Sequence, residues 1–358
     1  MNVQIGRQQG ILPFQCAVPL HSATAARALH SGAHATVGIR SRQGASTLAE
    51  KDAAAHYYQE GIIVAQEVRV GLLGIENSHS VAYTRLWQGD APPEERVAGA
   101  RVVACLNQNR TDQDAADEKK FLAQLKEMGV ENVVTRPEDM LGEVDAAAIV
   151  SRDGNEHLPL AEPFLKAGLP TFVDKPLANN LDVARKIVAL AKEHNAPLFS
   201  ASAVRYYAEI IEYQENRDEF GPVRSGSVWS HASRDLAFYG IHAIEIMSAL
   251  WGPGARWVSA FHSEDKHVAW VGYEHGGAYA VHLIRYCYPG FGFTYFGEKK
   301  SGTGAAATGG YVPICRLMTQ MFQDRKSPLD PAISLESIAI VEAFRKSQNG
   351  SVVELASL

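Results

Sequence analysis

The chain lacks the features that would tie it to a membrane, a nucleic acid or a disulfide framework. None of its uninterrupted apolar runs approaches the roughly 20 residues needed to cross a bilayer. The formal net charge of −6 argues against a mainly electrostatic partnership with nucleic acid or anionic lipid. The four cysteines are far apart and form no Cys-x-x-Cys pair, so reduced thiols are favoured. We expect a soluble protein of the cytoplasm.

Acidic side chains are almost absent from the first 65 residues, because no Asp or Glu precedes Glu50. Arginines lie scattered there among Ala, Ser, Gly and His. This composition has some features of an organelle transit peptide, but it lacks the apolar core of a secretory signal. Upstream sequence included by an early start site has the same features. We expect residues 1–65 to be a poorly ordered N-terminal extension outside the fold.

The next part of the chain alternates apolar runs with helical periodicities. The apolar runs, typical of buried parallel strands, are 68–74, 100–107, 143–150, 169–176 and 195–204. The helical periodicities are 114–129, 156–168 and 181–195. Strand alternating with helix predicts right-handed crossovers and a parallel sheet covered on both faces. We therefore expect a doubly wound, Rossmann-type α/β domain over residues 66–198.

Four polar or glycine positions follow directly after these predicted strands. They are Gly74, Asn107, Ser151 and Lys175. Parallel strands all end at the same edge of a sheet, and ligands bind beyond that edge, near the point where the strand order reverses. The sequence therefore predicts that these residues meet at one binding edge.

The pattern changes after about residue 228. Short segments rich in Val, Tyr, Phe and Trp lie at 257–263, 266–275, 277–286 and 292–300. They predict a mainly antiparallel sheet with one face covered, flanked by helices at 239–251 and 334–350, the second capped by Ser334. We expect an α+β domain over residues 199–358. Because the other sheet face would need cover, this domain is expected to form a homodimer or homotetramer.

Several motifs resemble the Gfo/Idh/MocA family, the group of glucose–fructose oxidoreductase and inositol dehydrogenase. A histidine, a helix, Ala-Gly, a strand and then Asp174-Lys175-Pro176 look like the family's stretch that ends in Glu-Lys-Pro. Gly240-Ile-His242 followed by Leu-Trp-Gly252 is similar to its Gly-x-His run. The resemblance covers residues 68–358. It implies an NAD(P)-dependent oxidoreductase that acts on a sugar or a cyclitol-like polyol.

The glycine-rich turn departs from the family pattern. Gly74-Ile-Glu76-Asn-Ser-His79 keeps only the first glycine of Gly-x-Gly-x-x-Gly. Glu76 brings a negative charge to the place where the phosphates of a dinucleotide would lie. The start of the next helix could still attract an anion, with Asn77 or Ser78 as its cap. A turn that merely begins a helix fits the same residues.

Two further departures concern the cofactor and the reacting group. Asn107 stands where an acid would grip a ribose hydroxyl, and Arg110 nearby could meet a 2′-phosphate, which tilts the cofactor from NAD toward NADP. A solvated loop arginine is the alternative. The family's aspartate four residues before the histidine is Phe238 here. Asp235 is close enough to substitute for it, or to cap the helix instead.

The chemistry needs a base for a hydroxyl proton and a cation beside the same oxygen. His242 has the residue type whose ordinary pKa is about 6.5, which suits a base at neutral pH. The resemblance gives Lys175 the role of stabilising the alkoxide. Tyr239 lies one turn before His242, and Glu245 one turn after it. Tyr239 could touch substrate and Glu245 could orient the imidazole, although for Glu245 alone we expect solvation at the surface.

Aromatic and hydrogen-bonding groups elsewhere would suit a sugar in a concave site. The residues expected to line it are His157, Arg205, Tyr206 and Tyr207. His79 could approach His157 there, but no spacing of carboxylates and histidines predicts a metal site.

Two other functions remain open at the level of the sequence. One is a glycosidase of the same family that uses NAD for a transient oxidation. The other is a carbohydrate- or nucleotide-sensing protein that has lost turnover, since a fold alone does not fix function. Glu76 and Phe238 both favour the sensor.

Overall fold

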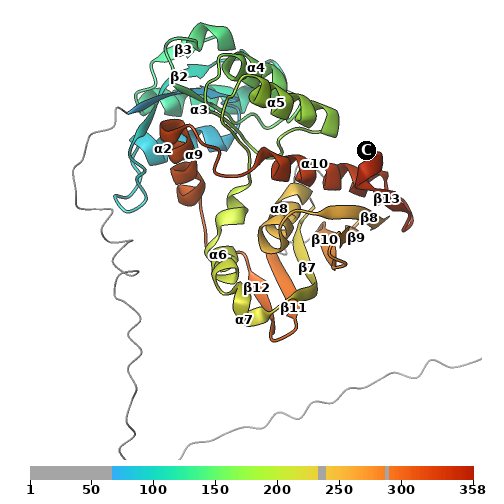
Figure 1. Ribbon diagram of the computed structural model, residues 1–358. Coiled ribbons are helices and arrows are strands. Elements are labelled where there is room, and N and C mark those ends of the chain that lie inside the picture. Colours follow the sequence, from blue (N-terminus) through green and yellow to red (C-terminus); the bar gives the residue numbers. More distant parts are fainter. Residues whose placement is uncertain (1–66, 233–238, 287–289) are drawn as a thin grey trace, which may run out of the picture. The chain divides into compact units, whose positions relative to one another are not determined.

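The computed structural model describes residues 67–358 apart from 233–238 and 287–289 (Figure 1). The extension expected over residues 1–65 lies outside the described residues, and so do Asp235 and Phe238. The described residues belong to one compact unit. The domain boundary expected near residue 198 therefore stays a prediction.

The first sheet is parallel and has six strands in the order β3-β2-β1-β4-β5-β6. The strands are β1 (Val68–Leu73), β2 (Ala100–Leu106), β3 (Asn132–Val134), β4 (Ala146–Ile149), β5 (Thr171–Val173) and β6 (Leu198–Phe199). The chain runs outward from β1 to β3 and then returns to β4 on the other side of β1. This confirms the doubly wound prediction and puts the reversal of strand order between β1 and β4.

Helices cover both faces of this sheet. They are α2 (Ser78–Gln88), α3 (Ala115–Glu127), α4 (His157–Lys166) and α5 (Leu181–Glu193). Successive residues of β1 enter different apolar clusters, because side chains alternate across a strand. Leu73 packs with residues of α4 and α5, whereas Leu72 packs with residues of α2 and of a later helix.

The second sheet has seven strands in the order β12-β11-β7-β10-β9-β8-β13. The strands are β7 (Val223–His231), β8 (Ala255–His262), β9 (Lys266–Tyr273), β10 (Ala278–Ile284), β11 (Gly292–Gly297), β12 (Ser301–Ala305) and β13 (Val352–Glu354). Only the pairing of β7 with β10 is parallel, so the prediction of a mainly antiparallel sheet is confirmed. Helices α8 (Gly240–Trp251) and α10 (Pro331–Lys346) pack against one face.

Two late helices tie the second half of the chain to the first. Helix α10 packs on both α5 and α8, and Figure 1 shows it running between them. Helix α9 (Val312–Asp324) packs on α2 and β1. There the indole Nε1 of Trp87 donates to Thr319 Oγ1 at 2.9 Å inside the apolar core. The remaining short helices are η1 (Pro137–Met140), η2 (Ala203–Tyr206), α6 (Ala208–Glu215), α7 (Arg217–Phe220) and η3 (Leu355–Ser357).

The expected cap of the last long helix was wrong. Helix α10 begins at Pro331, and the carboxylate of Asp330 accepts from Ala332 N at 2.9 Å. Proline favours the first helical position, which extends the helix three residues earlier than expected. Ser334 is buried inside the helix, and its hydroxyl donates to Ser200 O at 2.7 Å.

Among the helices that the structure describes, none has both the length and the apolar character to span a bilayer.

Candidate functional site

A cavity of about 610 Å³ lies at the carboxyl edge of the first sheet. Its wall combines residues from both halves of the chain: Asn77, Ser78, His79, Asp117, Arg152, Lys175, Ser202, Ala203, Val204, Tyr207, Tyr239, His242, Phe291 and Tyr311. Lys175 follows β5 and His242 lies on α8. Folding therefore brings the two predicted reacting residues to the same cavity. We call the part of the cavity around them the reaction end.

His242 is oriented by a hydrogen-bond partner at the reaction end. Its Nδ1 lies 2.7 Å from Ser202 Oγ, at the start of η2. Burial lowers the pKa of His242 well below its ordinary value, and the nearby Lys175 and His79 lower it further, against an opposing effect of Asp174. The ring is thus neutral at pH 7 and can accept a proton.

A second histidine, His79, faces the same cavity. It lies in the first turn of α2, and its Nδ1 is 2.6 Å from Asp174 Oδ2. Its Nε2 is 3.0 Å from the hydroxyl of Tyr311, the residue before α9. Burial by itself would raise the pKa of Asp174, but the His79 ring and Lys175 outweigh burial and keep that pKa below its ordinary value. Sequence reasoning missed this cluster.

The turn after β1 and the start of α2 form another part of the cavity wall, which we call the phosphate end. Gly74 has φ +83°, and a Cβ there would lie 2.1 Å from Ser151 N, so the loops after β1 and β4 touch at this glycine. Asn77 caps α2: its Oδ1 accepts from His79 N at 3.2 Å. The amide of Asn77 also donates to Val150 O at 2.8 Å and fixes α2 to the end of β4.

Glu76 is turned inward, away from the cavity. Its side chain is only 1% exposed, and Oε1 accepts from Ser151 Oγ at 2.9 Å and from Arg152 N at 2.7 Å. Burial raises the pKa of Glu76, while the Arg152 backbone and Arg110 act in the opposite direction. Glu76 therefore does not fill the space above the start of α2.

Two arginines bind the carboxylates of the phosphate end. Arg110 pairs with Glu156 and lies 3.6 Å from Glu76 Oε2. Arg152 reaches from the loop after β4 to Asp117 at 2.7 Å and also pairs with Asp114, at the start of α3. Arg110 was expected to be free for a 2′-phosphate or solvated. Its side chain is instead 8% exposed and enclosed by acids.

Residues 68–202 match the family described as "Oxidoreductase family, NAD-binding Rossmann fold" (GFO_IDH_MocA). Over this segment the chain is similar to the Gfo/Idh/MocA oxidoreductase family. The resemblance predicted from the motifs is thereby confirmed. No curated protein matches the sequence.

Solved structures share the whole architecture. Scyllo-inositol dehydrogenase from Lactobacillus casei, with bound NAD(H) and scyllo-inositol, has a TM-score of 0.67 and 15% identity, over 81% of this chain and 100% of that one. GenD2 from gentamicin A biosynthesis, in complex with NAD, has a TM-score of 0.67 and 18% identity, over 83% and 98%. An oxidoreductase from Agrobacterium radiobacter, in complex with NAD+, L-tartaric acid and magnesium, has a TM-score of 0.65 and 16% identity, over 82% and 99%.

Several residues expected at the site lie elsewhere. His157 is fully buried, with its ring nitrogens 2.9 Å from Ser151 O and 3.2 Å from Leu177 O, so it lines no cleft. Tyr206 packs its ring against Phe199 and does not line the cavity. Tyr207 and Tyr239 do line it, as expected. Asn107 binds only its neighbour Asn109 among the described side chains, at the outer side of the phosphate end.

The expectations for Arg205 and Glu245 were also wrong. Glu245 is 2% exposed rather than solvated, and its Oε2 lies 3.5 Å from Arg205 Nη1. Burial raises the pKa of Glu245, partly offset by Arg205. The pair connects α8, which carries His242, to η2, which follows Ser202. It supports the reaction end from beneath instead of contacting a ligand.

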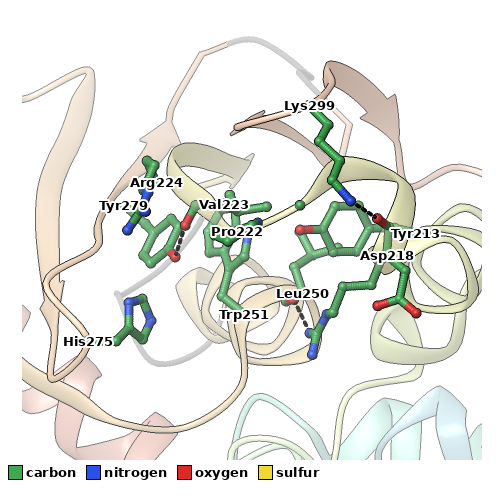
Figure 2. Close-up of a pocket in the computed structure, with 12 residues that line it drawn as sticks. Tyr213, Asp218, Pro222, Val223, Arg224, Leu250, Trp251, His275, Tyr279 and Lys299 are labelled. Atoms are coloured by element: carbon green, nitrogen blue, oxygen red, sulfur yellow. Dashed lines mark hydrogen bonds between the residues drawn. The ribbon is translucent and has the colours of Figure 1, made fainter.

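A second cavity of about 600 Å³ lies beside β7 and α8 (Figure 2). Trp251 stacks on Tyr279 with ring centroids 3.9 Å apart. Two polar side chains in the wall of this cavity bind the backbone. Tyr279 donates to Val223 O at 3.3 Å, and Lys299 donates to Asp218 O at 3.4 Å. These bonds stabilise a corner of the second sheet. The residues of the described chain offer no cluster for a metal ion here or elsewhere.

Proposed function

We propose that the chain is an NAD(P)-dependent dehydrogenase that moves a hydride between a sugar or polyol carbon and a nicotinamide. The observation that carries this proposal is the convergence of Lys175 and His242, which come from separate elements, on one cavity at the carboxyl edge of the first sheet. Solved inositol dehydrogenases have the same fold, which supports a polyol as substrate.

The residues of the phosphate end fit a dinucleotide. Gly74 supplies a crowded turn with positive φ, and the start of α2 offers backbone N–H groups at Ser78 and beyond. Arg152 lines the same part of the cavity. Asn77 and Ser151 hold the two loops together from below. When bound, the nicotinamide supplies the hydride acceptor. The choice between NAD and NADP stays a prediction, since Arg110 already has carboxylate partners.

The residues of the reaction end then divide two tasks. In the tautomer that the reaction needs, Nδ1–H of neutral His242 donates to Ser202 Oγ, and Nε2 accepts the hydroxyl proton. The ammonium group of Lys175 stabilises the negative charge that develops on the same oxygen. Tyr239 lies one turn before His242, with ring centroids 5.6 Å apart, and forms part of the cavity wall that would contact the substrate.

The decisive experiment measures cofactor binding and turnover together. NADH and NADPH are titrated by fluorescence, and a panel of polyols and sugars is tested for NAD(P)-dependent oxidation. Lys175→Ala and His242→Ala are expected to lower kcat by about 100-fold to 1,000-fold, the typical effect of removing a catalytic donor or base. Lys166→Ala, which removes an exposed lysine paired with Glu162, serves as the control.

The alternatives give different results in the same experiment. Release of an aglycone from glycosides without net reduction of cofactor indicates the NAD-dependent glycosidase. Nucleotide or sugar binding without any turnover indicates the sensing protein. Failure of both cofactors to bind contradicts the dehydrogenase.

We also propose that copies of this chain associate through the uncovered face of the second sheet. Phe261, Trp270 and Phe296 are 46–59% exposed, and the pairing register puts all three on that face. Large apolar side chains exposed on an uncovered sheet face are typical of an interface. A homodimer or homotetramer is expected, and a monomeric mass in solution would contradict it. A cytoplasmic location agrees with the buried, unpaired thiols of Cys105 and Cys315.

A further inference from the structure

Asp174, His79 and Tyr311 form a chain of hydrogen bonds that ends at the reaction end of the cavity. Two contacts, of 2.6 Å and 3.0 Å, join a buried carboxylate to an imidazole and the imidazole to a phenol. Asp174 directly follows β5, His79 lies in the first turn of α2 and Tyr311 directly precedes α9. His79 and Tyr311 are 232 positions apart.

The direction of this chain follows from the chemistry of its members. Asp174 stays ionised, so it only accepts, and Nδ1 of His79 must carry the proton between them. Where this proton is the only one on the ring, Nε2 is an acceptor, so the hydroxyl of Tyr311 donates to it. The phenol donates its only proton to His79, so toward the cavity its oxygen can only accept a hydrogen bond.

The surrounding packing holds the phenol in this orientation. Tyr83 lies one turn after His79 on α2. Its ring packs against those of His79 and Tyr311, with ring centroids 5.6 Å and 5.5 Å apart. Phe172, two residues before Asp174, meets Tyr83 edge to face. Burial, with smaller effects of nearby Asp174 and of other phenols, raises the pKa of Tyr311 to about 12, so its proton stays in place at neutral pH.

We propose that this chain makes Tyr311 the residue that selects and orients a hydroxyl group of the ligand. The proposal rests on the proposed function and sharpens it: the ligand must present a hydrogen-bond donor to the phenol oxygen. A hydroxyl meets this requirement, whereas a methoxy group or a carbonyl at the same place leaves two acceptors facing each other. Tyr311 contacts the ligand, and His79 and Asp174 are positioning residues.

The first test needs neither cofactor nor substrate. Nitrogen NMR of the histidine side chains at pH 7.5, with the His79 signals assigned by their loss in His79→Gln, reports which ring nitrogen carries the proton. We expect a proton on Nδ1 and none on Nε2. A proton on Nε2, alone or in a charged ring, would reverse the polarity at Tyr311 and overturn the proposal.

The second test uses the polyol that gives the highest turnover. Tyr311→Phe keeps the ring and removes the oxygen, and we expect kcat/KM to fall by about 10-fold to 100-fold, the value of a buried hydrogen bond to a ligand. Tyr295→Phe, the same change in a buried phenol of the second sheet, is the control. Wild-type values of kcat/KM in Tyr311→Phe would overturn the proposal.

A double-mutant cycle separates positioning from general structural damage. His79→Met removes both contacts and should match the loss in Tyr311→Phe, whereas His79→Gln keeps an acceptor for the phenol and should retain more activity. In the Tyr311→Phe background His79→Met should cost nothing further, because it acts through the same oxygen. Additive losses would overturn the proposal. If no polyol is turned over at all, the proposed function fails, and the NMR measurement alone decides about the chain.

Discussion

The two ends of the cavity are organised in different ways. At the reaction end, both histidines have a defined partner that fixes the direction of the ring: Ser202 for His242, and Asp174 for His79. At the phosphate end, carboxylates outnumber guanidinium groups around Arg110 and Arg152. The reaction end thus holds oriented acid–base groups. At the phosphate end, Glu76 stands in place of a glycine of the family's turn, so we expect substitutions there to change cofactor affinity most.

The largest effect is expected from removing the support beneath the reaction end. Arg205→Ala leaves Glu245 buried without its cation, and breaking a buried pair typically costs about 3–5 kcal/mol of unfolding free energy. Urea unfolding followed by tryptophan fluorescence measures the loss. The matched control is Arg224→Ala, which breaks an exposed pair with Glu298 and should cost at most about 0.5 kcal/mol. Equal losses in both variants would show that the reaction end does not depend on this pair.

An intermediate effect is expected at the phosphate end. Glu76→Gln removes a negative charge but keeps an oxygen that can accept from Arg152 N. We expect the Kd for NADH to fall by about 10-fold, equivalent to about 1.4 kcal/mol, because one like charge no longer opposes the pyrophosphate. Glu162→Gln, which changes an exposed acid paired with Lys166, is the control. An unchanged Kd in Glu76→Gln would mean that the contrast between the two ends does not influence the cofactor.

The smallest effect concerns pH. Burial raises the pKa of Glu76 above its ordinary value of 4.5, while the backbone of Arg152 and the guanidinium of Arg110 lower it, and Glu156 shares the hydroxyl of Ser151 with Glu76. A raised pKa in the folded state stabilises the fold fully below pH 4.5, and this contribution is lost as the pH rises through the folded pKa.

The stability of the wild type relative to Glu76→Gln should therefore decrease from pH 4.5 upward. Urea midpoints of both proteins between pH 4.5 and 7.5 measure this difference. Parallel curves would indicate that Glu76 does not titrate in this range, and that its charge is fixed in the folded state.

The first sheet was largely predictable because its strands are continuous apolar runs separated by amphipathic helices. Strand β3 was missed because it is short and half-exposed. It is a strand because it pairs with β2, and a pairing between distant segments leaves no pattern in the local sequence. Helix α9 was missed for a related reason. Its apolar side chains are buried against α2 and β1, which lie far away in the sequence. Local periodicity predicts an element, but not the distant surface that it covers.

The two residues expected to react were named partly from chemistry and partly from motifs. His242 was selected as a base of suitable pKa, and Lys175 through the motif that resembles the family's Glu-Lys-Pro. Both lie in the wall of one cavity, and their catalytic roles stay a prediction. The roles of Arg110 and Arg205 were misjudged because the sequence does not reveal which carboxylate a guanidinium meets after folding. His79 and Tyr311 were not connected for the same reason. Only the replacement of the third glycine by a histidine at the start of α2 could have drawn attention to this position.

The docking of α9 on the first sheet has a consequence for synthesis. Ile314, Met318 and Phe322 belong to the same apolar cluster as Val70 and Leu72 of β1. Until residues 312–324 have left the ribosome, that side of the sheet stays in contact with water or with a chaperone. The first sheet is synthesised early, but its apolar face is covered only after α9 has been made. A nascent chain stopped before α9 is therefore expected to be prone to aggregation.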